Sequence, residues 1–125
     1  IFCIGETANE KKQGKTFSVL SGQIQNSIEK NFNLNKIIIA YEPVWSIGTN
    51  KIPKMNDLKN TIKFIKNDFK KILKTKKLPK VLYGGSVNDN NISLFSSISE
   101  MDGFLIGGAS QSSKKFIDIV KNYYK

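Results

Sequence analysis

Hydrophobic positions along this chain alternate between short continuous runs and longer stretches with helical spacing. The short runs lie at residues 1–5, 37–41, 81–86 and 103–108, and the second contains three consecutive isoleucines. A continuous β-branched run of this kind predicts a strand buried on both faces of a parallel sheet. Between the runs, apolar residues recur every three or four positions, which predicts amphipathic helices. The expected order is therefore β-α-β-α-β-α-β-α.

Each strand is expected to be followed by a helix. The first three helices are expected at residues 16–32, 56–72 and 91–98. Asn56 or Asp57 is the expected cap of the second helix, whose outer face is filled by lysines, and Ser112 or Ser113 is the expected cap of the last. The inward positions of the last helix are expected to be Phe116, Val120 and Tyr123, with Ile117 and Tyr124 as further candidates.

Alternating strands and helices predict right-handed crossovers and a parallel sheet. An open doubly wound sheet and part of a (β/α)8 barrel both fit this order. A dinucleotide-binding sheet would carry G-x-G-x-x-G after its first strand, where this chain has only Gly5. The barrel is therefore favoured. It would be an α/β fold of four βα units with parallel strands, and residues 1–125 would belong to one domain. The special residues then share its functional face, at the carboxyl ends of the strands: Glu42, Gly84, Gly85, Ser86, Gly107 and Gly108.

The amino-acid composition limits the classes of binding partner that are expected. All 20 basic residues are lysine, against 10 acidic residues, and without arginine this excess indicates a solvated surface rather than a nucleic-acid site. No apolar run approaches the ~20 residues that cross a bilayer, so no membrane partner is expected. One cysteine, Cys3, and no histidine leave few ligands for a metal, so neither a metal nor a cofactor is expected. The cysteine count favours a cytoplasmic location.

Two glycine pairs, in YGGS and IGGAS, follow consecutive strands. Each alone is consistent with a tight turn. Together they favour a phosphate site, because glycine lets a ligand approach the backbone and barrel phosphate sites form from the loops after the last two strands.

Glu42 ends the second strand and is followed by an unusual loop. Pro43 fixes the backbone, Trp45 is bulkier than a plain turn requires, and Gly48 permits a close backbone approach. Alone, Glu42 would be read as a surface acid paired with a lysine. Beside a mobile apolar lid, an acid that closure removes from water becomes a stronger base, as proton abstraction requires.

Four motifs resemble the triosephosphate isomerase family over essentially the whole chain. They are CIGET (3–7), AYEPVWSIGT (40–49), YGGSV (83–87) and DGFLIGGAS (102–110). The resemblance implies the C-terminal half of a TIM barrel in a cytoplasmic homodimer without a cofactor. It implies an isomerase that interconverts dihydroxyacetone phosphate and glyceraldehyde 3-phosphate in glycolysis and gluconeogenesis. Glu42 would be the base that moves a proton through an enediol(ate).

The resemblance also assigns roles to the loops. Residues 43–51 would form a lid that begins at a hinge of Pro43, Val44 and Trp45. Backbone N–H groups that would hold the substrate phosphate belong to Gly48, Ser86, Gly107 and Gly108. Further lid and latch positions are Ile47, Thr49, Tyr83, Glu6 and Leu105.

Among these positions, Tyr83 and Ser86 would latch the closed lid, and Glu6 would receive the Trp45 indole when the lid opens. Ile47 and Leu105 would exclude water from the base. Cys3, the neighbour of Glu42, is expected to pack rather than react, because no basic group is placed to lower the pKa of its thiol.

Three positions depart from the family pattern. Ser46 stands where alanine is usual and Asn50 where glycine is usual, so the stiffness of the lid is expected to differ. Lys66 replaces a common arginine and is expected to face Glu100.

Four parallel strands cannot close into a barrel, and the lysine and histidine that would polarise the substrate carbonyl are expected in another half. The chain is therefore expected to be a fragment of a longer protein, inactive alone. Two alternatives stay open: another phosphate-binding barrel isomerase or epimerase, and a noncatalytic basic binding module.

Overall fold

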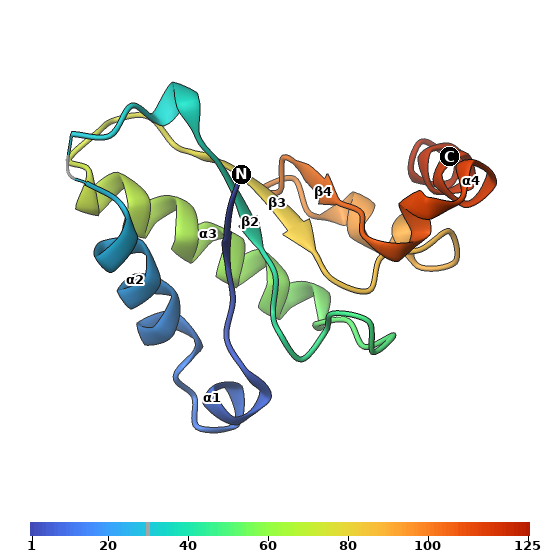
Figure 1. Cartoon of the computed structure of the whole chain (residues 1–125), viewed down its shortest axis with the longest axis horizontal. Coiled ribbons are helices and arrows are strands. Elements are labelled where there is room, and N and C mark those ends of the chain that lie inside the picture. The colour runs from blue at the N-terminus through green and yellow to red at the C-terminus, as the bar shows by residue number, and fades with distance from the viewer. Residues whose placement is uncertain (30) are drawn as a thin grey trace.

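The computed structural model describes residues 1–29 and 31–125. Its sheet has four parallel strands in chain order, β1 (Phe2–Ile4), β2 (Ile38–Tyr41), β3 (Lys80–Gly84) and β4 (Gly103–Leu105), as Figure 1 shows. A doubly wound sheet would reverse its strand order at a switch point, whereas a barrel keeps winding in one direction. The predicted partial (β/α)8 barrel is therefore confirmed over the part of the chain that the structure describes.

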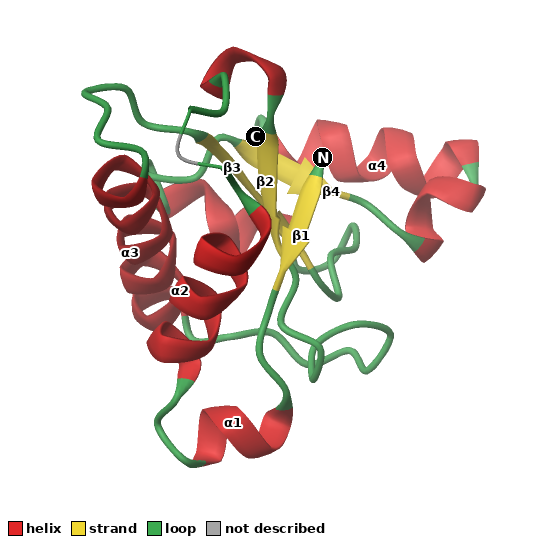
Figure 2. Ribbon diagram, turned by 60° about the vertical axis from the view of Figure 1, so that its left-hand side comes forward, coloured by secondary structure: helices red, strands yellow, loops and turns green. Residues whose placement is uncertain are grey.

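Helices cover one face of the sheet. Figure 2 shows α2 and α3 together on one face, where Phe17 of α2 stacks on Phe64 of α3 with ring centroids 4.4 Å apart. α4 lies beyond β4, away from this pair (Figure 1). The α-helices are α1 (Ala8–Lys12), α2 (Thr16–Ser27), α3 (Met55–Ile72) and α4 (Ser113–Tyr123). Short 3₁₀ turns cover Leu34–Lys36, Ile92–Ser97 and Gly108–Gln111. In the described ranges, no helix is both long and apolar enough to cross a membrane.

Helix boundaries differ from the prediction in three places. α2 ends at Ser27 rather than at residue 32, because Ile28 is already extended. α3 has Lys54 as its N-cap, without a side-chain hydrogen bond, and Asp57 lies inside the first turn, where its charge meets the positive end of the helix dipole. The unpredicted α1 is fixed by a capping box between Thr7 and Glu10, whose T-x-x-E spacing is visible in the sequence.

The inward face of α4 is also different from the prediction. Its cap is Ser112, one of the two expected residues, whose hydroxyl accepts from the Lys115 N–H. Ile119 is the buried residue, whereas Phe116 and Val120 are exposed. The helix packs mainly against the 3₁₀ turns at Ile92–Ser97 and Gly108–Gln111, and the Tyr123 ring meets Phe104 of β4 edge to face with centroids 5.4 Å apart.

The core lies between the sheet and the helices α2 and α3, and the opposite face of the sheet is open. Ile39 and Val81 on the core side are fully buried. Cys3 and Ile38 on the other side are exposed. The prediction that the 37–41 strand is buried on both faces is therefore wrong at Ile38, because the described strands do not close around that face.

Lys66 has a different partner from the one expected. Its ammonium lies 2.6 Å from a carboxylate oxygen of Asp102, while Glu100 pairs with Lys59 and Lys63 at 3.5 and 3.2 Å. The same Asp102 oxygen accepts the Val81 N–H at 2.8 Å, so Lys66 reaches the seam between β3 and β4.

Candidate active site

Glu42 is positioned by the register of three strands. Because Ile4 pairs with Tyr41 and Tyr41 with Tyr83, the next residue on each strand brings Glu42 between Gly5 and Gly84. The Glu42 N–H donates to the Ile4 carbonyl at 2.7 Å. The base predicted from the sequence therefore lies at the carboxyl end of the sheet, fixed through its own backbone.

Both flanking glycines leave room that no other residue would leave. A Cβ atom at Gly84 would lie 2.7 Å from Glu42 Cγ and 2.8 Å from its Oε1. A Cβ atom at Gly5 would lie 1.9 Å from the Glu42 carbonyl oxygen. The Gln23 amide of α2 holds Gly5 from the other side, with hydrogen bonds of 3.0 Å to both its N–H and its C=O. The acid is thus confined by close backbone packing.

The Glu42 side chain shares a cavity of about 260 Å³ with the lid. Ile47, predicted as the tip that excludes water from the base, lines this cavity together with Val44 and Cys3. Leu105, its predicted partner, lies instead at the end of β4 in register with Gly84. Of the two residues predicted to exclude water from Glu42, Ile47 lines this cavity and Leu105 does not.

Cys3 is the titratable neighbour of the base. The pKa of its thiol is raised, chiefly by a hydrogen bond to the Glu42 carboxylate, then by partial burial and the negative charge of Glu42. A raised pKa leaves less thiolate at a given pH, and the thiolate is the reactive form. This agrees with the expected low reactivity of Cys3, although its side chain is exposed rather than packed.

The contact between Cys3 and Glu42 predicts a pH-dependent reactivity. Below the ordinary pKa of a thiol, Glu42→Gln should speed alkylation of Cys3 by iodoacetamide, because removing the charge lowers the thiol pKa and increases the thiolate fraction. The rate is followed across pH by mass spectrometry of the Cys3 peptide in the folded protein. In denaturant the two proteins should react equally. Equal rates in the folded state would mean that Glu42 does not act on Cys3.

The lid, residues 43–51, bends at two positions with positive φ. Gly48 has φ +67° and Asn50 has φ +60°. Glycine tolerates this conformation and asparagine does so better than most other residues. The unusual Asn50 is therefore compatible with the bend that glycine would make. The Thr49 hydroxyl donates to the Trp45 carbonyl at 2.9 Å and tightens the turn.

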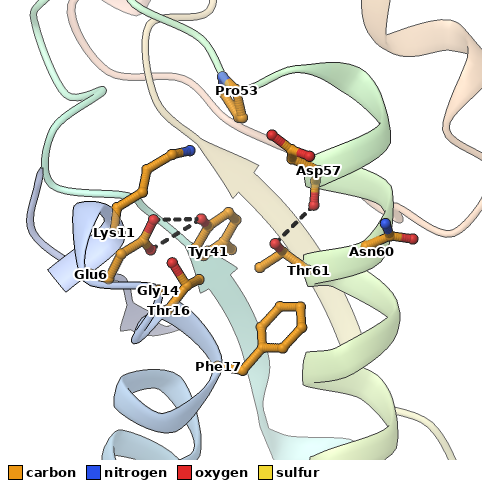
Figure 3. Close-up of a pocket in the computed structure, with 10 residues that line it drawn as sticks. All are labelled: Glu6, Lys11, Gly14, Thr16, Phe17, Tyr41, Pro53, Asp57, Asn60 and Thr61. Atoms are coloured by element: carbon orange, nitrogen blue, oxygen red, sulfur yellow. Dashed lines mark hydrogen bonds between the residues drawn. The ribbon is translucent and has the colours of Figure 1, made fainter.

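The first hinge of the lid rests on a buried acid. Glu6 is fully buried and accepts hydrogen bonds from the Tyr41 hydroxyl at 3.0 Å and the Trp45 indole N–H at 2.9 Å. Burial and the charge of Glu6 raise the pKa of Tyr41, so its hydroxyl stays a donor. Lys11 lies 4.0 Å above the Trp45 ring, a cation–π contact. Figure 3 shows Glu6, Tyr41 and Lys11 at one side of a cavity of about 270 Å³ behind this hinge.

The contact predicted for the closed lid and the contact predicted for the open lid are both present in this structure. The Ser86 hydroxyl accepts the Asn50 N–H at 2.9 Å, while Trp45 is bonded to Glu6. The expectation that these contacts belong to two alternative lid positions does not match the structure, which holds both together.

The four residues predicted to hold phosphate line one cavity of about 370 Å³: Gly48, Ser86, Gly107 and Gly108. Lys115 of α4 adds a positive side chain and Asp89 a negative one. Gly85 also lines this cavity, and its neighbour Gly84 touches Glu42. Glu42 and the polar cavity therefore lie next to two consecutive glycines, Gly84 and Gly85.

Several contributors were missed by the sequence reasoning. The local sequence around Gly5 and Gln23 does not indicate that they contribute to the site, because their contribution depends on the strand register. The role of Lys115 depends on where α4 begins. The sequence places Gly84 at the end of a strand but does not indicate its contact with Glu42. It marks Ser46 as a departure from the family pattern but does not indicate its partner.

Comparison with known proteins agrees with this geometry. The family model for triosephosphate isomerase matches residues 1–123. Triosephosphate isomerase of Dictyoglomus thermophilum is 41% identical and is matched over 98% of this chain and 51% of its own length. Those of Thermodesulfovibrio yellowstonii and Yarrowia lipolytica are each 40% identical, over 97% and 98% of this chain and 50% and 49% of their own lengths. The chain thus spans about half the length of the curated relatives it matches. It belongs to the triosephosphate isomerase family.

Proposed function

We propose that residues 1–125 form the C-terminal half of a single barrel that interconverts dihydroxyacetone phosphate and glyceraldehyde 3-phosphate, with Glu42 as the base. The observation that carries this proposal is the Glu42 carboxylate packed against Gly84, one residue from a polar cavity lined by the four predicted phosphate-binding residues.

The reaction moves one proton between two carbons and one between two oxygens. The Glu42 carboxylate takes a proton from the carbon beside the carbonyl, and the electron pair of that C–H bond forms the C=C bond of an enediol(ate) while the carbonyl oxygen takes up the negative charge. Glu42 then returns the proton to the neighbouring carbon, and the hydroxyl proton passes from one oxygen to the other, so the aldehyde and ketone exchange places without gain or loss of atoms. Backbone N–H groups of the 370 Å³ cavity hold the phosphate, and Ile47 keeps water from the base.

The remaining catalytic groups belong to the proposal as well. A lysine and a histidine that polarise the carbonyl would come from a second set of βα units, which would also pair with β1 and β4 and close the barrel. These units are either part of the same polypeptide or supplied by another. The closed barrel would act as a homodimer in the cytoplasm. Its reaction would be one step of glycolysis and gluconeogenesis.

The proposal is tested on a completed barrel. We define this as the present chain joined to the part of the Dictyoglomus thermophilum relative that it does not cover. The completed barrel should convert dihydroxyacetone phosphate, and the 125-residue chain alone should not. Turnover of a pentose phosphate but not of triose phosphates would replace the proposal with an epimerase. Salt-dependent binding of RNA or DNA without any turnover would favour a basic binding module.

A further inference from the structure

Ser46 is buried in a lid whose neighbouring residues face solvent. Its exposed fraction is 0%, whereas those of Val44 and Ile47 are 52% and 51%. A buried hydroxyl is destabilising unless it is hydrogen-bonded, so its partners matter.

Every hydrogen-bonding site of that hydroxyl is used. Its proton is donated to the Lys51 carbonyl at 2.5 Å. The Tyr83 hydroxyl, 3.0 Å away, must then be the donor of the second bond. The Ser86 N–H gives a third, longer bond of 3.4 Å. One donor and two lone pairs are all that a hydroxyl has. A single atom therefore joins the end of the lid, strand β3 and the turn that follows β3.

The backbone of Ser46 adds to the same connection. Its carbonyl accepts the Ser86 hydroxyl proton at 2.5 Å, and the Ser86 oxygen accepts the Asn50 N–H at 2.9 Å. The lid is thus tied to Ser86 on both sides of Gly48, which lines the polar cavity.

Gly85 provides the space for these contacts. A Cβ atom there would lie 2.3 Å from the Tyr83 hydroxyl oxygen and 2.7 Å from Ser46 Oγ. The pair of hydroxyls therefore fills the volume that a side chain at position 85 would take. Among the described residues, Ser46 is the only hydrogen-bond partner of the Tyr83 hydroxyl.

We propose that Ser46 is a positioning residue that couples the lid to the turn at Gly85 and Ser86, so that the loop covering the polar cavity and the turn lining it move as one unit. Ser46 acts through Tyr83 and Ser86 and does not touch the reacting atoms. The consequence for turnover rests on the proposed function, whereas the coupling itself does not.

Limited proteolysis of the completed barrel tests the coupling without any assay of turnover. Lys51 is exposed, so trypsin can cut the bond between Lys51 and Ile52 when the lid opens. Ser46→Ala should speed this cut by about tenfold, the usual scale for one lost hydrogen bond. Inorganic phosphate should protect the unsubstituted protein at this bond and protect the variant less. The cut is identified by the masses of its products.

Two further variants decide whether Ser46 acts through Tyr83. Tyr83→Phe should have the same effect as Ser46→Ala, and the double variant should cut no faster than either, because both remove one shared contact. Ser96→Ala is the matched control, since that hydroxyl donates only to the Ser93 carbonyl on an exposed 3₁₀ turn. Cutting of Ser46→Ala at the unsubstituted rate, or full addition of the two effects, would overturn the proposal.

Turnover separates this inference from the proposed function. With triose phosphate as substrate, Ser46→Ala should lower kcat/KM by about tenfold and leave thermal unfolding cooperative. If the parent barrel is inactive but Ser46→Ala still speeds cutting after Lys51, the proposed function is wrong and the coupling is supported. An active parent with no change in either cutting or kcat/KM on Ser46→Ala would end the coupling alone.

Discussion

Glu42→Gln in the completed barrel should lower kcat for triose phosphates by about 10²–10⁴-fold, the range that a positioned general base contributes. The amide has the shape of the carboxylate and can occupy the same place between Gly5 and Gly84, but it cannot accept the substrate proton. KM should change little, because the phosphate contacts lie in the separate 370 Å³ cavity. Steady-state kinetics in both directions measure the effect.

A shorter acid at the same position separates chemistry from geometry. Glu42→Asp keeps the carboxylate but withdraws it by about one methylene, and a displacement of this size costs roughly 10² in rate. The loss should again appear in kcat rather than KM. Aspartate or glutamine variants that turn over at the rate of the parent would remove Glu42 as the base.

Gly84→Ala should lower kcat by about 10²-fold with the base still present. The new Cβ would lie 2.7–3.0 Å from Glu42 Cγ, Oε1 and Cδ, closer than such atoms approach, so the carboxylate must move. A base displaced by about an ångström loses its alignment with the substrate C–H bond. The protein should still fold, because the clash is with a side chain that can turn aside.

Substitutions at two other glycines serve as comparisons for Gly84→Ala. Gly22→Ala in α2 meets nothing within 4 Å and should leave activity unchanged, with stability rising by about 0.5–1 kcal/mol. Gly5→Ala meets the Glu42 backbone at 1.9 Å and should prevent normal folding. Kinetics and thermal unfolding of the three variants side by side make the comparison. A fully active Gly84→Ala would show that the carboxylate is not confined as described.

The strands and their parallel order could be predicted because they depend on local patterns. Continuous apolar runs indicate strands that are buried by helices. Because the segments between these runs have helical spacing, only a few ways of connecting the strands are possible. The position of Glu42 at the end of β2 followed from the same runs. The lid and phosphate residues came from the family resemblance, and their gathering around one cavity agrees with it. Their roles stay predictions.

The remaining features depend on relations between segments that no local pattern contains. The steric roles of Gly5 and Gly84 exist only once the register places them beside Glu42. The partner of Lys66 depends on how α3 crosses the seam between β3 and β4. The buried side of α4 depends on how that helix packs against the two neighbouring 3₁₀ turns. Ser46 was visible as an unusual residue, but its partner Tyr83 is 37 positions away.

The central claim is that Glu42 moves a proton between two carbons of a triose phosphate. It is tested most directly by running the completed barrel in D₂O and following carbon-bound deuterium in the product by NMR. A base that exchanges its proton with solvent should leave deuterium on the product carbon, and Glu42→Gln should reduce incorporation in step with kcat. Turnover and deuterium incorporation by the Glu42→Gln variant at the rates of the parent would contradict the account.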